Sequence, residues 1–187
     1  MSINFTARPV ANPQIKHRTS FFKYSEEGAH IVELDRKDIA DMKALNKTAK
    51  DWRDNSGKYA DQIFERFNRL NNSDYVKEHV FALTTQQKDF KALESDKILG
   101  LMMFNELKGP ENEILVLEVN PNTSKSLNFF RKYKDVGKRL VKYAQETFNN
   151  KGITVWSDYN AIKFYKKLGF EQPYRKLPKA CELHWKV

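Results

Sequence analysis

AIKFYKKLGF, at residues 161–170, carries more information about this chain than any other stretch of it. Ala161, Phe164, Tyr165 and Leu168 recur at helical spacing and share one face, while the lysines lie outside that face. Gly169 can take the positive φ that ends a helix. The pattern predicts a short amphipathic helix followed directly by a strand. Tyr165 is unusual on the inner face, because a buried hydroxyl needs a partner; it either packs in the core or serves a site.

The composition predicts a soluble, single-domain protein. The chain has 187 residues, of which 40% are hydrophobic and 13% aromatic, and these values suffice for one packed core. A single cysteine, Cys181, excludes an intrachain disulfide and suits a reducing compartment. No apolar run approaches the roughly 18–20 residues of a membrane span, and no secretory signal is expected near Met1. We therefore expect a cytoplasmic location and no membrane partner.

The chain is strongly basic, with a formal net charge of +9 and a pI near 9.5. This balance suits anionic partners, namely nucleic acid, an acidic surface or a phosphate-bearing cofactor. One cluster of cations, Arg8, Lys16, Arg18 and Lys23, lies in residues 1–25, which contain no acidic residue. We expect residues 1–28 to form a basic tail that is disordered or loosely docked, and a transit peptide is the less favoured alternative.

Residues 29–187 form the predicted folded domain. Apolar patterns predict strands at residues 31–34, 80–83, 98–104, 114–119, 153–156, from 170 onward, and 181–187. They predict helices from Asp35, as N-cap, to about residue 52, and over residues 59–70, 136–148 and 161–168. The order β-α-α-β-β-β-α-β-α-β-β indicates an α+β fold, with a mixed, mostly antiparallel sheet and helices on both faces.

The 161–170 stretch resembles the Ala-x-x-(Phe/Leu)-Tyr-x-x-x-Gly-Phe signature of the GNAT superfamily of N-acetyltransferases, and the order of elements over residues 29–187 is similar to that family's fold. The resemblance implies an acyltransferase that uses acetyl-CoA as its acyl donor and acetylates an amine by direct attack. In that family the tyrosine lies beside the sulfur of acetyl-CoA. The resemblance therefore gives Tyr165 the role of the general acid that protonates the departing thiolate.

A second resemblance lies where the strand ending at Val119 leads through a basic loop into the third helix. The N-terminus of a helix attracts anions, and the cations here are Lys125, Arg131, Lys132, Lys134, Lys138, Arg139 and Lys142. The run Gly137-Lys138-Arg139-Leu140-Val141 resembles the end of the family's Gln/Arg-x-x-Gly-x-Gly/Ala phosphate-binding signature, with Lys132 at its first position. The resemblance implies that the backbone of Leu117 to Val119 holds the pantetheine arm. The implied contacts of coenzyme A are Leu117, Val119, Lys132, Tyr133, Lys134, Asp135, Val136, Gly137, Lys138, Asp158 and Phe164.

Two aspartates depart from the family pattern. Asp135 takes the place of the signature's first glycine, and Asp158 that of a frequent asparagine. A carboxylate about 4 Å from the pyrophosphate would cost roughly 4 kcal/mol at an effective dielectric near 20, unless Asp135 caps the helix or pairs with Lys132 or Lys138. A catalytically weakened GNAT-fold binding or regulatory protein is therefore the alternative. Nucleic-acid binding ranks below both, because no recognition helix or RNA-binding signature accompanies the basic residues.

The general base is sought between two glutamates, at the start and near the end of the strand that leads to Val119. Glu118 interrupts the apolar run, where burial would raise its pKa, and Glu113 matches the base of some histone-acetylating relatives. Alternation places the two on opposite faces. Each has a structural alternative: an ion pair with a lysine for Glu118 and an exposed strand start for Glu113. His79 and His184 are expected to be structural, and no His or Cys spacing indicates a metal site.

The acceptor is expected to be a primary amine of a small molecule or a protein, and the sequence leaves its identity and the oligomeric state open. In the resembling fold the acceptor is selected by residues 36–75 and 170–187. Both regions are aromatic and basic, which would suit an anionic or aromatic acceptor, and the residues concerned are Trp52, Tyr59, Phe64, Phe67, Tyr174, Arg175 and Trp185.

Overall fold

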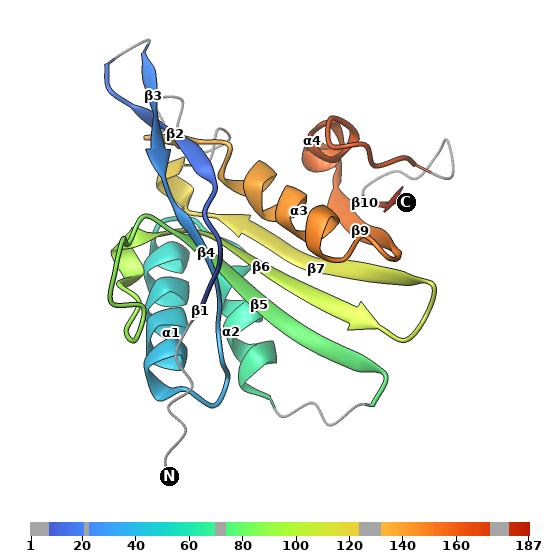
Figure 1. The fold of residues 1–187 in the computed structure, drawn as a ribbon, viewed down its shortest axis with the longest axis horizontal. Helices are drawn as coiled ribbons and strands as arrows, with labels where there is room; N and C mark the ends of the chain where they lie inside the picture. Colours follow the sequence, from blue (N-terminus) through green and yellow to red (C-terminus); the bar gives the residue numbers. More distant parts are fainter. Residues whose placement is uncertain (1–7, 21–22, 70–73, 124–131, 173–179) are drawn as a thin grey trace.

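A seven-stranded sheet forms the centre of the molecule (Figure 1). The computed structural model describes residues 8–20, 23–69, 74–123, 132–172 and 180–187. In spatial order the strands are β1 (Arg8–Ala11), β4 (His30–Glu33), β5 (Val76–Thr84), β6 (Ile98–Leu107), β7 (Glu111–Val119), β9 (Gly152–Asp158) and β10 (Ala180–Trp185). Neighbouring strands are antiparallel except for β7 and β9, which are parallel. The predicted mixed, mostly antiparallel sheet is confirmed.

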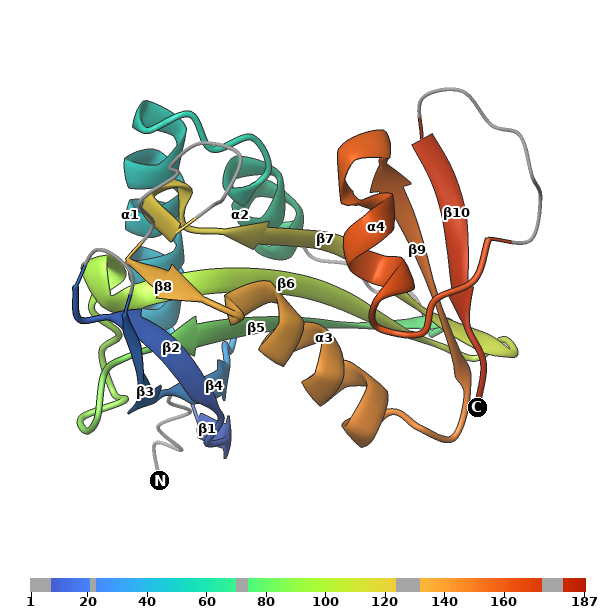
Figure 2. The same cartoon turned by 90° about the horizontal axis from the view of Figure 1, so that it is seen from above.

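Helices cover both faces of this sheet, as the sequence predicts (Figure 2). On one face lie α1 (Ile39–Asp54) and α2 (Ala60–Asn68); on the other lie α3 (Val136–Thr147) and α4 (Ile162–Lys166). Within the described residues, three short 3-10 helices connect the larger elements: η1 (Ser95–Lys97), η2 (Pro121–Thr123) and η3 (Tyr159–Ala161). Each face has its own apolar core, the α1/α2 cluster and the α3/α4 cluster. Among the described residues, no helix has the length and apolar character that a membrane span requires.

Residues 8–28 contain three strands in place of the loosely docked tail that the composition suggested. Besides β1, they form β2 (Gln14–Arg18) and β3 (Tyr24–Gly28), a hairpin that projects beyond the main sheet (Figure 1). The hairpin joins β8 (Tyr133–Lys134) in a second sheet of order β3-β2-β8. Ile15, only 1% exposed, anchors β2 in the α3/α4 cluster. Backbone pairing together with one buried side chain fixes this segment despite its polar composition.

Two local predictions need correction. The N-cap of α1 is Asp38 and not Asp35, because the Asp38 carboxylate accepts hydrogen bonds from the N–H groups of Ala40 and Asp41. The strand expected from residue 170 onward is reduced, within the described residues, to an isolated bridge between Glu171 and His184.

Gly100 lets α3 approach β6 closely, and its substitution should show this. A Cβ at this position would lie 2.7 Å from Cγ1 of Val136 and 2.9 Å from Cδ1 of Leu140. We expect Gly100→Ala to lower the free energy of unfolding by about 1–3 kcal/mol, the usual cost of overpacking, in denaturant titration. Gly109→Ala is the control, because a Cβ there would have no atom within 4 Å of it. Equal stability of the two variants would contradict this account of the packing.

Candidate active site

A β-bulge in β7 sets the shape of the site. The register with β6 passes from Met103 opposite Val116 to Phe104 opposite Ile114, so Leu115 is an extra residue without a partner. Leu115 and Val116, although consecutive, both pack against the α1/α2 cluster. A bulge bends its strand and increases the local twist. From this point on, β7 changes direction relative to its other neighbour.

That neighbour, β9, parts from β7 at the bulge. The two strands pair only from Glu111 opposite Gly152 to Ile114 opposite Val155, and beyond that their carboxyl ends diverge (Figure 2). Residues 115–119 therefore have no strand partner on the β9 side among the described residues. A cleft of about 560 Å³ lies here, between the ends of β7 and β9, the turn between α1 and α2, and Tyr165. Backbone groups along one wall of this cleft are free to bind a ligand.

Tyr165 presents a polar group from a buried position. Its side chain is 5% exposed and packs on the rings of Phe164 and Phe170, yet it lines the cleft. Its hydroxyl has no hydrogen-bond partner among the described residues. Burial raises the pKa of Tyr165 well above its usual value, and the nearby Asp158 carboxylate adds to the rise. The phenol is therefore protonated at neutral pH.

The end of α4 holds Tyr165 in place. The N–H of Phe170 donates to the carbonyl of Tyr165, and the N–H of Gly169 donates to that of Lys166. Gly169 has a φ of +87°. These are the two hydrogen bonds of a Schellman motif, and the contact of Tyr165 with Phe170 supplies the apolar pair that accompanies it. The predicted glycine-terminated helix is confirmed, and its termination fixes the tyrosine.

The N-terminus of α3 lies beside β7 and α4. A Cβ on Gly137 would lie 3.4 Å from Cγ1 of Val119, 3.5 Å from Cζ of Phe164 and 3.6 Å from Cδ2 of Leu117. The structure thus brings together these four of the residues that the family resemblance implies. The neighbouring Val136, the first residue of α3, has its side chain buried in the α3/α4 cluster.

Asp135 does not cap α3. It has a φ of +68° and a ψ of 7°, in the left-handed region, and its side chain makes no capping hydrogen bond. A side-chain N-cap needs extended backbone, which Asp135 lacks. Nor does it form an ion pair with Lys132 or Lys138, or with any other described residue. Aspartate is among the few non-glycine residues that tolerate this conformation, which explains why it stands where the family signature has glycine.

Cations surround the approach to α3. Lys132 and Lys138 are exposed, and Lys134 is half-buried. The pairing of β2 with β8 places Lys16 directly opposite Lys134, so part of the basic N-terminal cluster joins the basic cluster before α3. Tyr24 lies on the same side, with the Lys134 Nζ atom 3.6 Å from its ring centroid. Lys125 and Arg131 lie outside the described residues.

Glu118 is held by the turn between α1 and α2. Its carboxylate accepts from the backbone N–H of Lys58 at 2.6 Å and from that of Tyr59 at 3.1 Å. The interaction thus differs from the expected ion pair with a lysine side chain. It ties the start of α2 to the strand edge that lines the cleft.

Glu113 lies outside the cleft lining and accepts from Asn105 Nδ2 at 2.9 Å. The expectation that Glu113 and Glu118 lie on opposite faces is wrong, because the bulge shifts the alternation by one residue. Their partners on β6 are Asn105 and Leu101, four residues apart and hence on one face. That spacing separates the two carboxylates by about 13 Å along the sheet, so they cannot share one proton.

Asp158 and Tyr59 are bonded across the cleft. The Tyr59 hydroxyl donates to the Asp158 carboxylate at 2.7 Å, and this bond is the main cause that raises the pKa of Tyr59 above its usual value. Sequence reasoning missed this pair, because nothing local connects positions 59 and 158. It joins the α1–α2 turn to the end of β9.

Most of the residues expected from the sequence to form an aromatic and basic acceptor wall do not line the described part of the cleft. Trp52 and Phe67 are buried in the α1/α2 cluster, Phe64 packs against it, and Trp185 packs on the opposite face of the sheet. Only Tyr59 of that set lines the cleft. Tyr174 and Arg175 lie outside the described residues.

Both histidines flagged in the sequence lie between carboxylates in strands. His79 contacts Glu33 at 2.6 Å and Glu106 at 3.4 Å, and His184 contacts Glu111 at 3.0 Å. Among the described residues no three His, Cys, Asp or Glu side chains are placed to hold a metal ion.

The Schellman motif predicts a graded response at Gly169. An L-residue in the left-handed region costs roughly 1–2 kcal/mol, and asparagine tolerates it better than alanine. We expect Gly169→Ala to reduce the free energy of unfolding by about that amount and Gly169→Asn by less, both measured by denaturant titration. Gly28→Ala serves as control, because its φ is not positive and its nearest neighbour would be 3.9 Å away. A reversed order of the two Gly169 variants would count against the motif.

The sequence matches no protein-family model and no curated protein, but the structure is similar to several solved ones. Tetrahymena GCN5 aligns with a TM-score of 0.56 at 16% identity, over 83% of this chain and 94% of that chain. PaiA N-acetyltransferase from Thermoplasma acidophilum, in complex with coenzyme A, aligns with a TM-score of 0.51 at 15% identity, over 85% of this chain and 99% of that chain. The ribosomal-protein-S18-alanine N-acetyltransferase from Escherichia coli aligns with a TM-score of 0.53 at 13% identity, over 85% of this chain and 94% of that chain. The chain therefore has the fold of the Gcn5-related N-acetyltransferases.

Proposed function

We propose that this protein is an N-acetyltransferase that transfers the acetyl group of acetyl-CoA to a primary amine by direct attack. The observation that carries the proposal is the Tyr165 hydroxyl, which is protonated, has no partner among the described residues and lines the cleft where β7 and β9 part. An acyl transfer from a thioester needs a proton donor at the departing sulfur. The neighbouring fold relatives, one of them in complex with coenzyme A, support the same class of reaction.

The residues around the cleft fit coenzyme A as a substrate. Backbone groups of residues 115–119, which no described strand pairs on the β9 side, offer hydrogen bonds to a pantetheine arm, as a further strand would. The first N–H groups of α3, at Val136, Gly137 and Lys138, and the positive end of the helix dipole suit a pyrophosphate. Lys132 and Lys134 add positive charge. Tyr133, between them, is buried in the α3/α4 cluster and so anchors β8.

The proposed reaction has a balanced set of proton movements. The amine nitrogen attacks the thioester carbonyl carbon, the carbon–sulfur bond breaks, and the proton of Tyr165 passes to the sulfur. Backbone N–H groups on the free edge of β7 stabilise the carbonyl oxygen as it becomes negative. A lysine-like amine has an unperturbed pKa near 10.4, so it must lose a proton before attack. We assign that proton to Glu118 rather than Glu113, because only Glu118 of the two lines the cleft. The nitrogen loses a second proton as the amide forms, and that proton passes to the Tyr165 phenolate and restores the phenol.

One specific observation favours the alternative of a weakened binding or regulatory protein. The Asp135 carboxylate stands at the N-terminus of α3 with neither a capping bond nor an ion pair among the described residues, so its charge opposes an anionic ligand there. For both alternatives we propose a reducing compartment such as the cytoplasm, because the one cysteine, Cys181, is buried and free.

Tyr165→Phe separates binding from catalysis. Acetyl-CoA at concentrations well above micromolar should raise the melting temperature of both the unaltered protein and the variant. The variant should acetylate amines at least about 100-fold more slowly, as loss of a general acid predicts. Tyr159→Phe, at a position 70% exposed on the neighbouring 3-10 helix, is the control and should keep the rate. Absence of any shift with acetyl-CoA would refute the proposed function.

Asp135→Gly and Asp135→Asn test the charge beside α3. Both remove the carboxylate and both tolerate the left-handed backbone, so both should bind coenzyme A more tightly, by about fivefold for two unit charges near 4 Å apart in water. Titration calorimetry measures this affinity. Unchanged affinity in both variants would show that the carboxylate faces away from the ligand.

A further inference from the structure

One face of the sheet near the cleft carries a row of carboxylates. On β9 the side chains of Ile153 and Val155 belong to the α3/α4 cluster, so Trp156 and Asp158 point to the opposite face. The strand registers place further carboxylates on that same face, and with Asp158 they are Glu111, Glu113, Glu118 and Glu182.

Within the part of the chain that the structure describes, no helix packs over this part of the sheet. The buried residues of the α1/α2 cluster include none from β9 or β10. Figure 2 shows α1 and α2 placed over the other strands, at a distance from β9 and β10. Trp156, in the middle of the row, is 59% exposed. The face is therefore open to a ligand.

The carboxylates keep their negative charge unbalanced. Glu113 contacts Asn105, Glu111 and Glu182 contact His184, Glu118 accepts from backbone N–H groups, and Asp158 accepts from Tyr59. Among the described residues, none of the five carboxylates lies within 4 Å of the side-chain nitrogen of a lysine or arginine. This is unusual in a chain with 33 such residues and a net charge of +9, and it leaves a negative field at this face.

The cleft lies at one end of the row. Its lining includes Glu118, Trp156 and Asp158 together with Tyr165, and it contains one lysine, Lys58. Tyr165 is more than nine-tenths buried and lines that cleft, and its hydroxyl has no hydrogen-bond partner among the described residues. The acidic face is thus continuous with the place where an acceptor amine would react.

The spacing of the row suits a chain of positive charges. Glu182 stands opposite Trp156, two residues along β9 from Asp158, which is about 7 Å. Glu113 and Glu111 continue the row beside Thr154 and Gly152, to about 20 Å from Asp158. Trp156 lies on β9 between Asp158 and the position beside Glu113, and an aromatic ring attracts an ammonium group over its face.

We propose that the acceptor is a polycationic alkylamine, with one amino group at Tyr165 and its other ammonium groups along the carboxylate row. This inference rests on the proposed acetyltransferase function and names its acceptor class. The same field rejects amines that carry a carboxylate, since like charges oppose them. It replaces the expectation, drawn from sequence alone, of an anionic or aromatic acceptor.

Acetyl transfer to spermidine, to a trilysine peptide and to glycine measures the acceptor class. Spermidine, trilysine or both should be acetylated, and the ratio of their kcat/KM values tells whether a free polyamine or a lysine-rich peptide is the source. Glycine should react at least tenfold less efficiently. Glu182→Gln should raise the KM of the better acceptor about fivefold, and added salt should raise it further.

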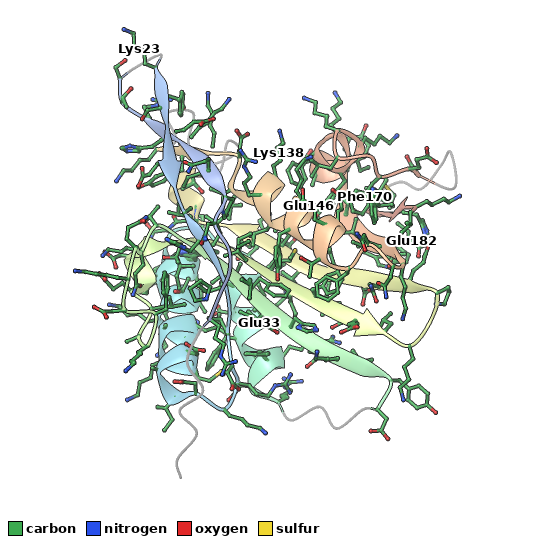
Figure 3. All side chains as sticks on the ribbon, viewed as in Figure 1. Lys23, Glu33, Lys138, Glu146, Phe170 and Glu182 are labelled. Atoms are coloured by element: carbon green, nitrogen blue, oxygen red, sulfur yellow. The ribbon has the colours of Figure 1, made fainter. Side chains whose placement is uncertain are left out.

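The matched control is Glu146→Gln, an exposed carboxylate on α3 and on the other face of the sheet, which should leave that KM unchanged (Figure 3). A preference for glycine, or equal effects of the two variants, would overturn the proposal.

Calorimetric titration of the protein with spermidine and with trilysine, in the absence of acetyl-CoA, separates this inference from the proposed function. Binding of either one that weakens in Glu182→Gln, without any acetyl transfer, would refute the enzyme and retain the polycation site. Stabilisation by acetyl-CoA together with acetyl transfer to glycine alone would retain the enzyme and refute the polycation site. Absence of both binding and transfer for both polycations refutes the polycation site whatever the outcome with acetyl-CoA.

Discussion

The extra residue in β7 is the constraint on which the site depends. A parallel strand pair that kept its register to the end would close the space between β7 and β9. With Leu115 inserted, β7 remains paired to β6 up to Val119 but leaves β9 after Ile114. The bulge is stabilised because both Leu115 and Val116 find apolar surroundings in the α1/α2 cluster. The cleft thus follows from packing on one face of the sheet.

Charge is distributed around that cleft in two separate regions. Cations gather before α3, because β8 pairs with the N-terminal hairpin, and carboxylates gather on the open face of β7, β9 and β10. Figure 3 shows Lys23 near the tip of the hairpin and Glu182 on the far side of the molecule. The net charge of the chain conceals this separation. An anionic donor and a cationic acceptor would each be drawn to its own side of Tyr165.

Local patterns in the sequence predicted the elements well and their long-range contacts poorly. The Gly169 stop signal, the apolar run of β6 and the helical stripe of α3 each depend on neighbours in sequence. The bulge at Leu115 has no such signal, since an apolar residue fits either face of a covered strand. The Tyr59–Asp158 bond joins residues 99 positions apart. The N-terminal strands were missed because their order comes from pairing with β8 and β4 and not from their own composition.

Asp135 and Asp158 are the residues that argue for a weakened site, and the structure gives each a physical reason that does not require lost activity. Asp135 occupies a left-handed backbone position that excludes most residues other than glycine, asparagine and aspartate. Asp158 accepts from Tyr59 and begins the carboxylate row. A hydrogen bond to a charged group is worth about 1.5–3 kcal/mol net, and an ammonium group, with its full charge, can replace the Tyr59 hydroxyl as the partner of Asp158. An aspartate serves that exchange better than the neutral asparagine of the family pattern.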